Sequence, residues 1–312
     1  MADKLKSEVS RQPVDPPLRL SGAILPLAIA IGLLALVATV VGLFWQTGGG
    51  SFTFTTLRGG TAEIFGQGLY RYDSVFTGAG NRGTDTVTLF LGVPFLALAT
   101  MLYRRGSLRG GLLLTGILGY FLYVYATYSL GVAYNELFLV YVALFSASLF
   151  AFILAFNSID LDALSSQVLD HLPRRGPGIF LIVAGLLTSL IWIEGPVTSL
   201  LTGLPPARMN SYTTLVTYAL DLAIIVPSCI IGGVMILRRN ALGYRIAFPL
   251  LVLIIMLVPG IIAQTIHQLS AGVSLSPGEI AGPVSGFLTL GLLAVLIIVA
   301  VLRKLPITSP SE

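Results

Sequence analysis

Eight long apolar stretches constrain this chain more than any other feature of its sequence. Most run for about 20 residues or more, the length that an α-helix needs to cross the ~30 Å hydrocarbon core of a bilayer. Only 10% of the residues are charged, whereas a soluble domain carries about 25%. The sequence therefore predicts an all-α, polytopic integral membrane helix bundle with eight transmembrane helices. We expect these at about 21–45, 84–105, 110–134, 137–156, 178–193, 212–239, 247–268 and 284–302.

The basic residues predict the orientation of these helices. Of the 18 Lys and Arg residues, 14 fall in the N-terminal tail or in short clusters on one side of the spans. The positive-inside rule makes that side, with both termini, cytoplasmic. Because the net charge of +4 lies in such clusters, we expect a lipid bilayer and no nucleic acid as partner. The first span reads as an uncleaved signal anchor, and we expect a bacterial inner (plasma) membrane.

The polar stretches between the spans predict the organisation of the chain. An amphipathic segment divides it into two four-helix halves, and Val93-Pro94 in the second span has an echo in Val226-Pro227 of the sixth. The echo is compatible with a 4+4 parallel repeat, an arrangement known in transporters, although apolar helices also match easily by chance. The expected parts are a tail at 1–20, a first half at 21–157 with a long external loop at 46–84, a cytoplasmic amphipathic linker at 158–177, a second half at 178–304 and a tail at 305–312. The alternation in Ser51–Thr55 predicts a small β-hairpin within the external loop.

Three short motifs resemble a group of bacterial multi-pass membrane proteins. They are Tyr70-Arg71-Tyr72-Asp73, Arg82-Gly83-Thr84-Asp85 and Gly119-Tyr120-Phe121-Leu122-Tyr123. The resemblance covers most of the chain. It implies a polytopic helical protein and brings no activity, cofactor or site residue with it.

Asp221 is the first candidate for a functional residue, because it reads as the one carboxylate clearly within an apolar span. A charge at that depth costs a few kcal/mol, so its side chain should face protein or water and not lipid. Thr217 and Tyr218 lie four and three residues before it, on the same helix face. Two interpretations carry equal weight: a solute or proton site, and a structural hydrogen bond that fixes helix packing.

Other polar residues near the expected outer side extend this candidate site. Tyr120 and Tyr123 of the third span, Gln264 and His267 of the seventh, and Glu194 at the outer end of the fifth could line a polar vestibule that narrows toward Asp221. Each has a plainer interpretation, such as an interfacial side chain for His267 or an aromatic belt for the tyrosines. At the mouth of the second span we expect Thr84 or Asp85 to cap the helix, and Arg82 and Asp85 to pair.

Function follows less directly from these patterns than architecture. The leading hypothesis is a protein with an outward-facing polar cavity that binds or transports a small solute without ATP, since a Walker A motif is absent. A structural or accessory subunit that docks a partner, or a second copy, through its aromatic outer loop is the alternative. A membrane-embedded enzyme acting on a lipid is the third, although no catalytic motif supports it. One cysteine and two histidines predict no metal site and no cofactor.

Overall fold

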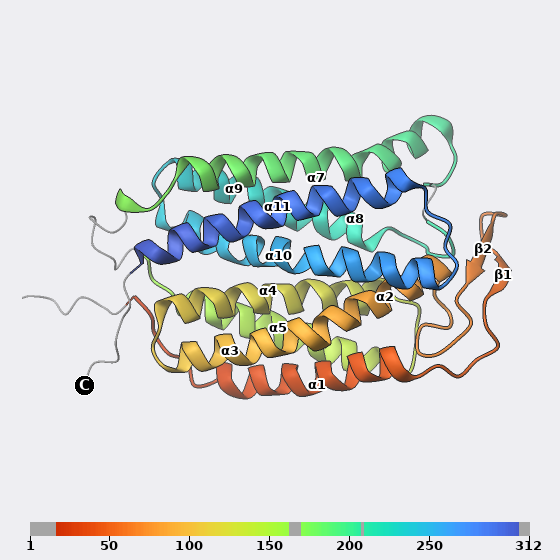
Figure 1. Cartoon of the computed structure of the whole chain (residues 1–312), viewed down its shortest axis with the longest axis horizontal. Helices are drawn as coiled ribbons and strands as arrows, with labels where there is room; N and C mark the ends of the chain where they lie inside the picture. The colour runs from red at the N-terminus through yellow and green to blue at the C-terminus, as the bar shows by residue number, and fades with distance from the viewer. Residues whose placement is uncertain (1–16, 162–169, 207–208, 306–312) are drawn as a thin grey trace, which may run out of the picture.

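The computed structural model describes residues 17–161, 170–206 and 209–305 of the chain. Over these residues it is a bundle of long helices that lie roughly side by side, with one small hairpin projecting from one end (Figure 1). Eight helical segments are long and apolar enough to cross a membrane. Among the described residues, the predictions of an all-α bundle and of eight helices long and apolar enough to cross a membrane are confirmed.

The first four spans form one side of the bundle. The first is α1 (Ile24–Phe44), and the second combines α2 (Val75–Val87), a π-helical turn η1 (Thr88–Gly92) and α3 (Val93–Arg104). The third and fourth are α4 (Leu108–Gly131) and α5 (Phe138–Asn157), which pack closely on each other. Buried side chains occur along the whole length of these spans. We call these four the N-terminal spans.

The last four spans lie beside them and are called the C-terminal spans. They are α7 (Arg175–Thr202), then α8 (Val216–Leu220) continued by a second π-helical turn η2 (Asp221–Ile225) and α9 (Val226–Leu237), then α10 (Ala241–Ser270) and α11 (Pro277–Lys304). Helix α10 lies at the centre of the molecule, where it packs against α2, α4, α9 and α11 (Figure 1).

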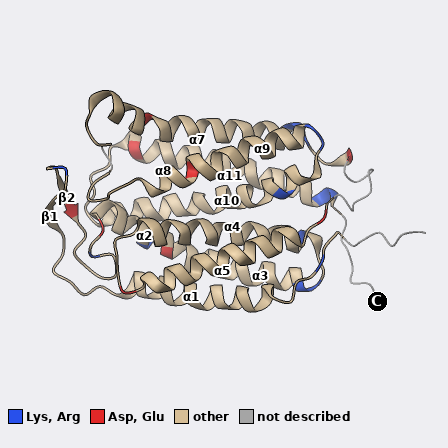
Figure 2. Ribbon diagram, turned by 180° about the vertical axis from the view of Figure 1, so that it is seen from behind, with Lys and Arg blue, Asp and Glu red and all other residues tan. Residues whose placement is uncertain are grey.

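The two ends of the bundle differ in charge. Most of the Lys and Arg residues drawn in Figure 2 gather at one end of the bundle. Arg104, Arg238 and Arg303 lie at the ends of α3, α9 and α11. We call this end of the bundle the arginine end. The opposite end, the hairpin end, carries β1 (Phe52–Thr55) and β2 (Thr61–Ile64), which pair antiparallel. The predicted hairpin is therefore confirmed.

Both π-helical turns immediately precede a Val-Pro pair. Proline has no N–H, and its ring crowds the carbonyl four residues back, so the preceding turn widens. In both spans the valine N–H instead bonds five residues back, from Val93 to the Thr88 carbonyl and from Val226 to the Asp221 carbonyl. The echo in sequence thus corresponds to the same local distortion in the second and sixth spans.

The expected start of the second span is wrong by about nine residues. The helix begins at Val75, where the Ser74 hydroxyl accepts from the Thr77 N–H, so Thr84 and Asp85 lie inside it and cap nothing. Its glycines suggest a loop in the sequence, but they allow close helix packing instead. A Cβ at Gly83 would collide with the backbone of Gln264 on α10. The external loop is correspondingly shorter than 46–84.

The fifth span does not end at Ile193, because α7 continues through Pro196 to Thr202 and stops at Gly203, whose φ of 71° is left-handed.

Most of the amphipathic linker, residues 162–169, lies outside the described residues. Leu161 and Leu172, on either side of that gap, are buried against the bundle.

Candidate functional site

Asp221 lies at the first position of η2 and is 8% exposed. Its Oδ1 accepts a hydrogen bond from the Tyr123 hydroxyl of α4 at 2.9 Å. Its Oδ2 accepts one from the Trp192 indole N–H of α7 at 2.7 Å. The carboxyl group therefore joins three spans, and both of its partners are neutral donors.

An aromatic pair lies beside this carboxyl group. The rings of Trp192 and Tyr218 are 4.2 Å apart between centroids, and Tyr218 and Thr217 lie one helical turn before Asp221. Of the predicted site residues, Asp221, Tyr123 and Tyr218 are thus brought together, with Thr217 adjacent in α8. Trp192 was missed, because the expected fifth span at about 178–193 places it at a helix end. The available signal was its indole N–H, which needs a partner when buried.

The other predicted site residues make contacts elsewhere. Tyr120 pairs with Thr88 at 2.7 Å, Gln264 donates to Thr84 at 3.0 Å, and the His267 ring lies 3.1 Å from the Thr86 hydroxyl. All three contacts tie α4 or α10 to the second span and not to Asp221. Glu194 is exposed on α7, two residues after Trp192 and so on a different face of the helix.

A second buried carboxylate, Asp85 of α2, was missed by the sequence interpretation. It is 1% exposed, so Asp221 is not the single carboxylate within a span. The Tyr70 hydroxyl donates to its Oδ2 at 2.6 Å, and the Tyr128 hydroxyl lies 3.3 Å from its Oδ1. The expected ion pair between Arg82 and Asp85 does not form in the described structure. Arg82 donates to the Leu43 carbonyl instead.

The surroundings of Asp85 are polar and tightly packed. The rings of Tyr125, Tyr128 and Tyr141 stack or meet edge to face at 5.2–6.4 Å. Within the described part of the chain, the hydroxyls of Tyr125 and Tyr141 and the Asn81 amide nitrogen are buried without a hydrogen-bond partner. Buried polar groups normally have partners, so we expect ordered water molecules among these side chains.

Packing of the C-terminal spans changes along the bundle at the level of Asp221. Toward the arginine end the helices approach closely through glycine: a Cβ at Gly178 would lie 2.9 Å from the Gly233 carbonyl, and one at Gly185 would lie 2.9 Å from Cys229 Cβ. All buried residues of α7 lie between Pro177 and Gly185. Those of α11 lie between Gly291 and Val301.

Toward the hairpin end α7, α8 and α11 have no buried residue, whereas α10 is buried as far as Gln268; we call the exposed part of these three helices the open region. None of the five residues of α8 is buried, and α7 and α11 have few contacts with each other. Leu200 and Leu201 of α7 are 86% and 83% exposed. Asp221 is therefore the buried residue of the sixth span that lies closest to the open region.

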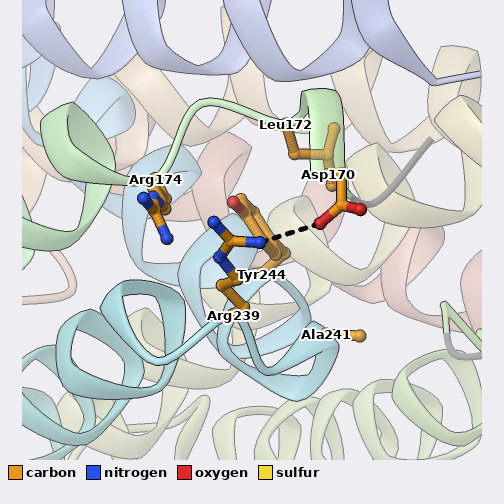
Figure 3. Close-up of a pocket in the computed structure, with 6 residues that line it drawn as sticks. All are labelled: Asp170, Leu172, Arg174, Arg239, Ala241 and Tyr244. Atoms are coloured by element: carbon orange, nitrogen blue, oxygen red, sulfur yellow. Dashed lines mark hydrogen bonds and ion pairs between the residues drawn. The ribbon is translucent and has the colours of Figure 1, made fainter. Parts of the chain in front are cut away.

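Two hollows occur at other places in the bundle. A groove of about 490 Å³ lies between the second span, α10 and α11. Its lining is apolar and comprises Leu91, Phe95, Ile255, Met256, Val258, Pro259, Leu288, Gly291, Leu292 and Val295. A small pocket of about 20 Å³ lies at the arginine end, where Arg239 pairs with Asp170 at 3.1 Å beside Arg174 and Tyr244 (Figure 3). Asp221 lines neither, so a polar cavity that reaches it stays a prediction.

Comparisons of the chain with protein-family models, with curated proteins and with solved structures find no match. In the described ranges, no three His, Cys, Asp or Glu side chains gather where they could hold a metal ion.

Proposed function

We propose that this chain is a multi-pass inner-membrane protein that binds or transports a small polar solute without ATP. The solute enters from the hairpin end, which is the outer side, and the arginine end faces the cytoplasm in accordance with the positive-inside rule. The observation that carries the proposal is the position of Asp221. It is a buried carboxylate at the level where close packing of the C-terminal spans gives way to the open region.

The chemistry of the site favours one class of solute. Asp221 has no Lys or Arg partner among its hydrogen bonds, which come from Tyr123 and Trp192. A carboxylate beside the aromatic pair of Trp192 and Tyr218 suits a small organic cation, through charge and through cation–π attraction. The π-helical turn supports this role, because such turns occur frequently at functional sites.

Asp221→Asn tests the proposal, because it keeps the size of the side chain and removes its charge. The melting temperature of the full-length protein in detergent is measured with a panel of amines, sugars and organic acids. We expect wild type to show a ligand-induced increase with an amine, and Asp221→Asn to lose it while staying folded. Asp170→Asn is the matched control, since Asp170 is an exposed carboxylate at the arginine end; it should respond like wild type.

Asp221→Leu separates binding from packing. It leaves the Tyr123 hydroxyl and the Trp192 N–H without their acceptor, which costs about 1–3 kcal/mol per buried group. If Asp221→Asn keeps the full ligand response and only Asp221→Leu lowers the melting temperature, Asp221 is a packing residue and the proposal is wrong.

The hairpin favours a second candidate function, that of an accessory subunit. Phe52 and Phe54 share one face of β1 and are both exposed, and Leu57 at the hairpin turn is 89% exposed. An exposed apolar patch of this kind suits a protein partner on the outer side. A chain that responds to no solute in the panel would make this the better supported function.

A further inference from the structure

Tyr212 joins the two sets of spans at the hairpin end. It lies just before α8, in the segment that follows α7, and its hydroxyl donates to Asp73 Oδ1 at 2.6 Å. Asp73 belongs to the external loop and directly precedes Ser74, the N-cap of α2. Arg58 in the hairpin turn reaches the Tyr212 carbonyl at 3.4 Å. The side chain and the backbone of Tyr212 are thus both held by the external loop.

Asp73 is 0% exposed, and among the described residues no basic side chain contributes to its pKa. Its Oδ1 also accepts from the Ala133 N–H at 2.9 Å, whereas its Oδ2, among the described residues, has no partner. Arg71, two residues earlier, pairs with Glu136.

The other described groups near Asp73 are uncharged. Asn135 in the α4–α5 connection and Tyr141 on α5 each have a buried polar atom without a partner in the described structure. The Tyr141 hydroxyl lies close enough to feel the charges of both Asp73 and Asp85. Arg82 lies on the Asp85 side of this cluster, where it acts on Asp85.

Burial has a direct effect on proton binding here. It raises the pKa of Asp73 from its usual value near 4 to about 7, although hydrogen bonds from Ala133 and Tyr212 oppose this increase. When Tyr212 moves away from Asp73 and water reaches the carboxyl group, the pKa of Asp73 returns toward its usual value. The closed arrangement therefore binds the proton more tightly than the open one, and by linkage the proton stabilises the closed arrangement.

We propose that Asp73 and Tyr212 form a proton-operated latch that holds α8 against the N-terminal spans. With its proton bound, Asp73 stays buried and the latch is closed; when the proton leaves, the bare carboxylate draws in water and Tyr212 is released. None of the five residues of α8 is buried, and the next hydrogen bonds to α4 and α7 are those of Asp221 at its end, so the start of α8 can move while Asp221 stays in place. The latch goes beyond solute binding, because it controls the opening of the outer end with or without a solute.

Thiol labelling of the full-length protein tests the latch. Cys229 is buried and is replaced by Ala, and Val216→Cys then provides the reporter, because Val216 packs against Gly131 of α4. Leu57→Cys in the exposed hairpin turn is the reference, and the ratio of the two rates removes the intrinsic pH dependence of the thiol. The reagent is a charged maleimide that cannot enter the bilayer.

The expected result has a defined pH range. Opening increases by up to about tenfold per pH unit between about pH 4 and about pH 7 and levels off above, because the two pKa values bound the range. The parent protein carries the cysteine substitutions alone and keeps Asp73 and Tyr212. Measured from about pH 5 to about pH 8, its ratio of labelling rates should rise and then level off. Asp73→Asn should give a low ratio at every pH. Tyr212→Phe should give a high ratio already at acid pH, and Tyr134→Phe, an exposed control, should behave like the parent.

Two results would overturn the latch: a flat profile in the parent, or a rise that survives in Asp73→Asn. If Asp73→Asn does not fold, the parent profile and Tyr212→Phe still decide, since a Tyr212→Phe ratio equal to the parent ratio at acid pH contradicts the latch. Because no solute is added, a negative result for the latch does not bear on solute binding at Asp221, which the Asp221→Asn variant tests separately.

Discussion

Tyr70 shows how a single hydroxyl keeps a carboxylate buried in this protein. It donates to Asp85 Oδ2 from the external loop, and its burial raises its own pKa well above the usual value, so it remains a donor. The site also restricts its neighbour on α1: a Cβ at Gly42 would collide with the same oxygen atom.

Replacing Tyr70 by Phe should therefore destabilise the protein. The substitution leaves Asp85 Oδ2 buried without its donor, at a cost of about 1–3 kcal/mol. We expect a lower melting temperature in detergent. Tyr72→Phe is the control, because Tyr72 is exposed and contributes its ring to Arg71; equal melting temperatures for the two variants would contradict this role of Tyr70.

At the scale of elements, the helix pair α2–α10 holds the bundle together through close approach and polar contacts. Gly83 lets the two backbones meet, and Thr84 and Thr86 pair with Gln264 and His267 on either side of it. Small residues at a membrane helix interface allow this approach, and hydrogen bonds across it add about 0.6 kcal/mol each.

Gly83→Ala should separate these helices and destabilise the fold. The added methyl group has no space, and overpacking of this kind costs about 1–3 kcal/mol. Gly260→Ala on α10 is the matched control, because nothing lies within 4 Å of the Cβ it would add. Thermal unfolding of both variants in the same detergent is the measurement. A Gly83→Ala protein as stable as Gly260→Ala would show that the backbones can move apart at no cost.

Helix α2 shows which features of the fold can be predicted from the sequence and which cannot. Apolar length was enough to predict eight spans, because the bilayer imposes it. It was not enough to find the start of α2, since Gly78, Gly80 and Gly83 look like a loop until their partners on α10 and in the external loop are known. For the same reason Asp85 was placed at a helix end, whereas the Asp221–Tyr123 pairing joined two residues that the sequence had singled out separately.

At the scale of the whole molecule, the two sets of spans differ in how fully they are packed. The N-terminal spans carry buried side chains along their whole length, whereas the buried residues of α7 and α11 lie only toward the arginine end. In the proposed orientation, the open region faces the outer side of the membrane.

Reporter fusions test this orientation. Reporters inserted at Gly59 in the hairpin turn and at Gly203 after α7 should be external, because both lie at the hairpin end. Fusions after Gly106 and after Lys304 should be cytoplasmic, because both follow arginine-rich helix ends. Insertion at Gly59 and at Gly203 is expected to be tolerated, as both residues are exposed and nothing lies within 4 Å of an added Cβ. If the reporters at Gly59 and at Gly203 lie on opposite sides of the membrane, the eight-span arrangement is wrong.

Helix α4 has a consequence for communication within the molecule. Tyr120 and Tyr123 lie three residues apart on this one helix, and they bond to Thr88 and Asp221, the first residues of the two π-helical turns. A rigid helix cannot turn under one tyrosine and stay still under the other. A movement of α4 that lengthens the bond to Asp221 would also displace the bond to Thr88, and by thermodynamic reciprocity such a coupling would act equally in both directions.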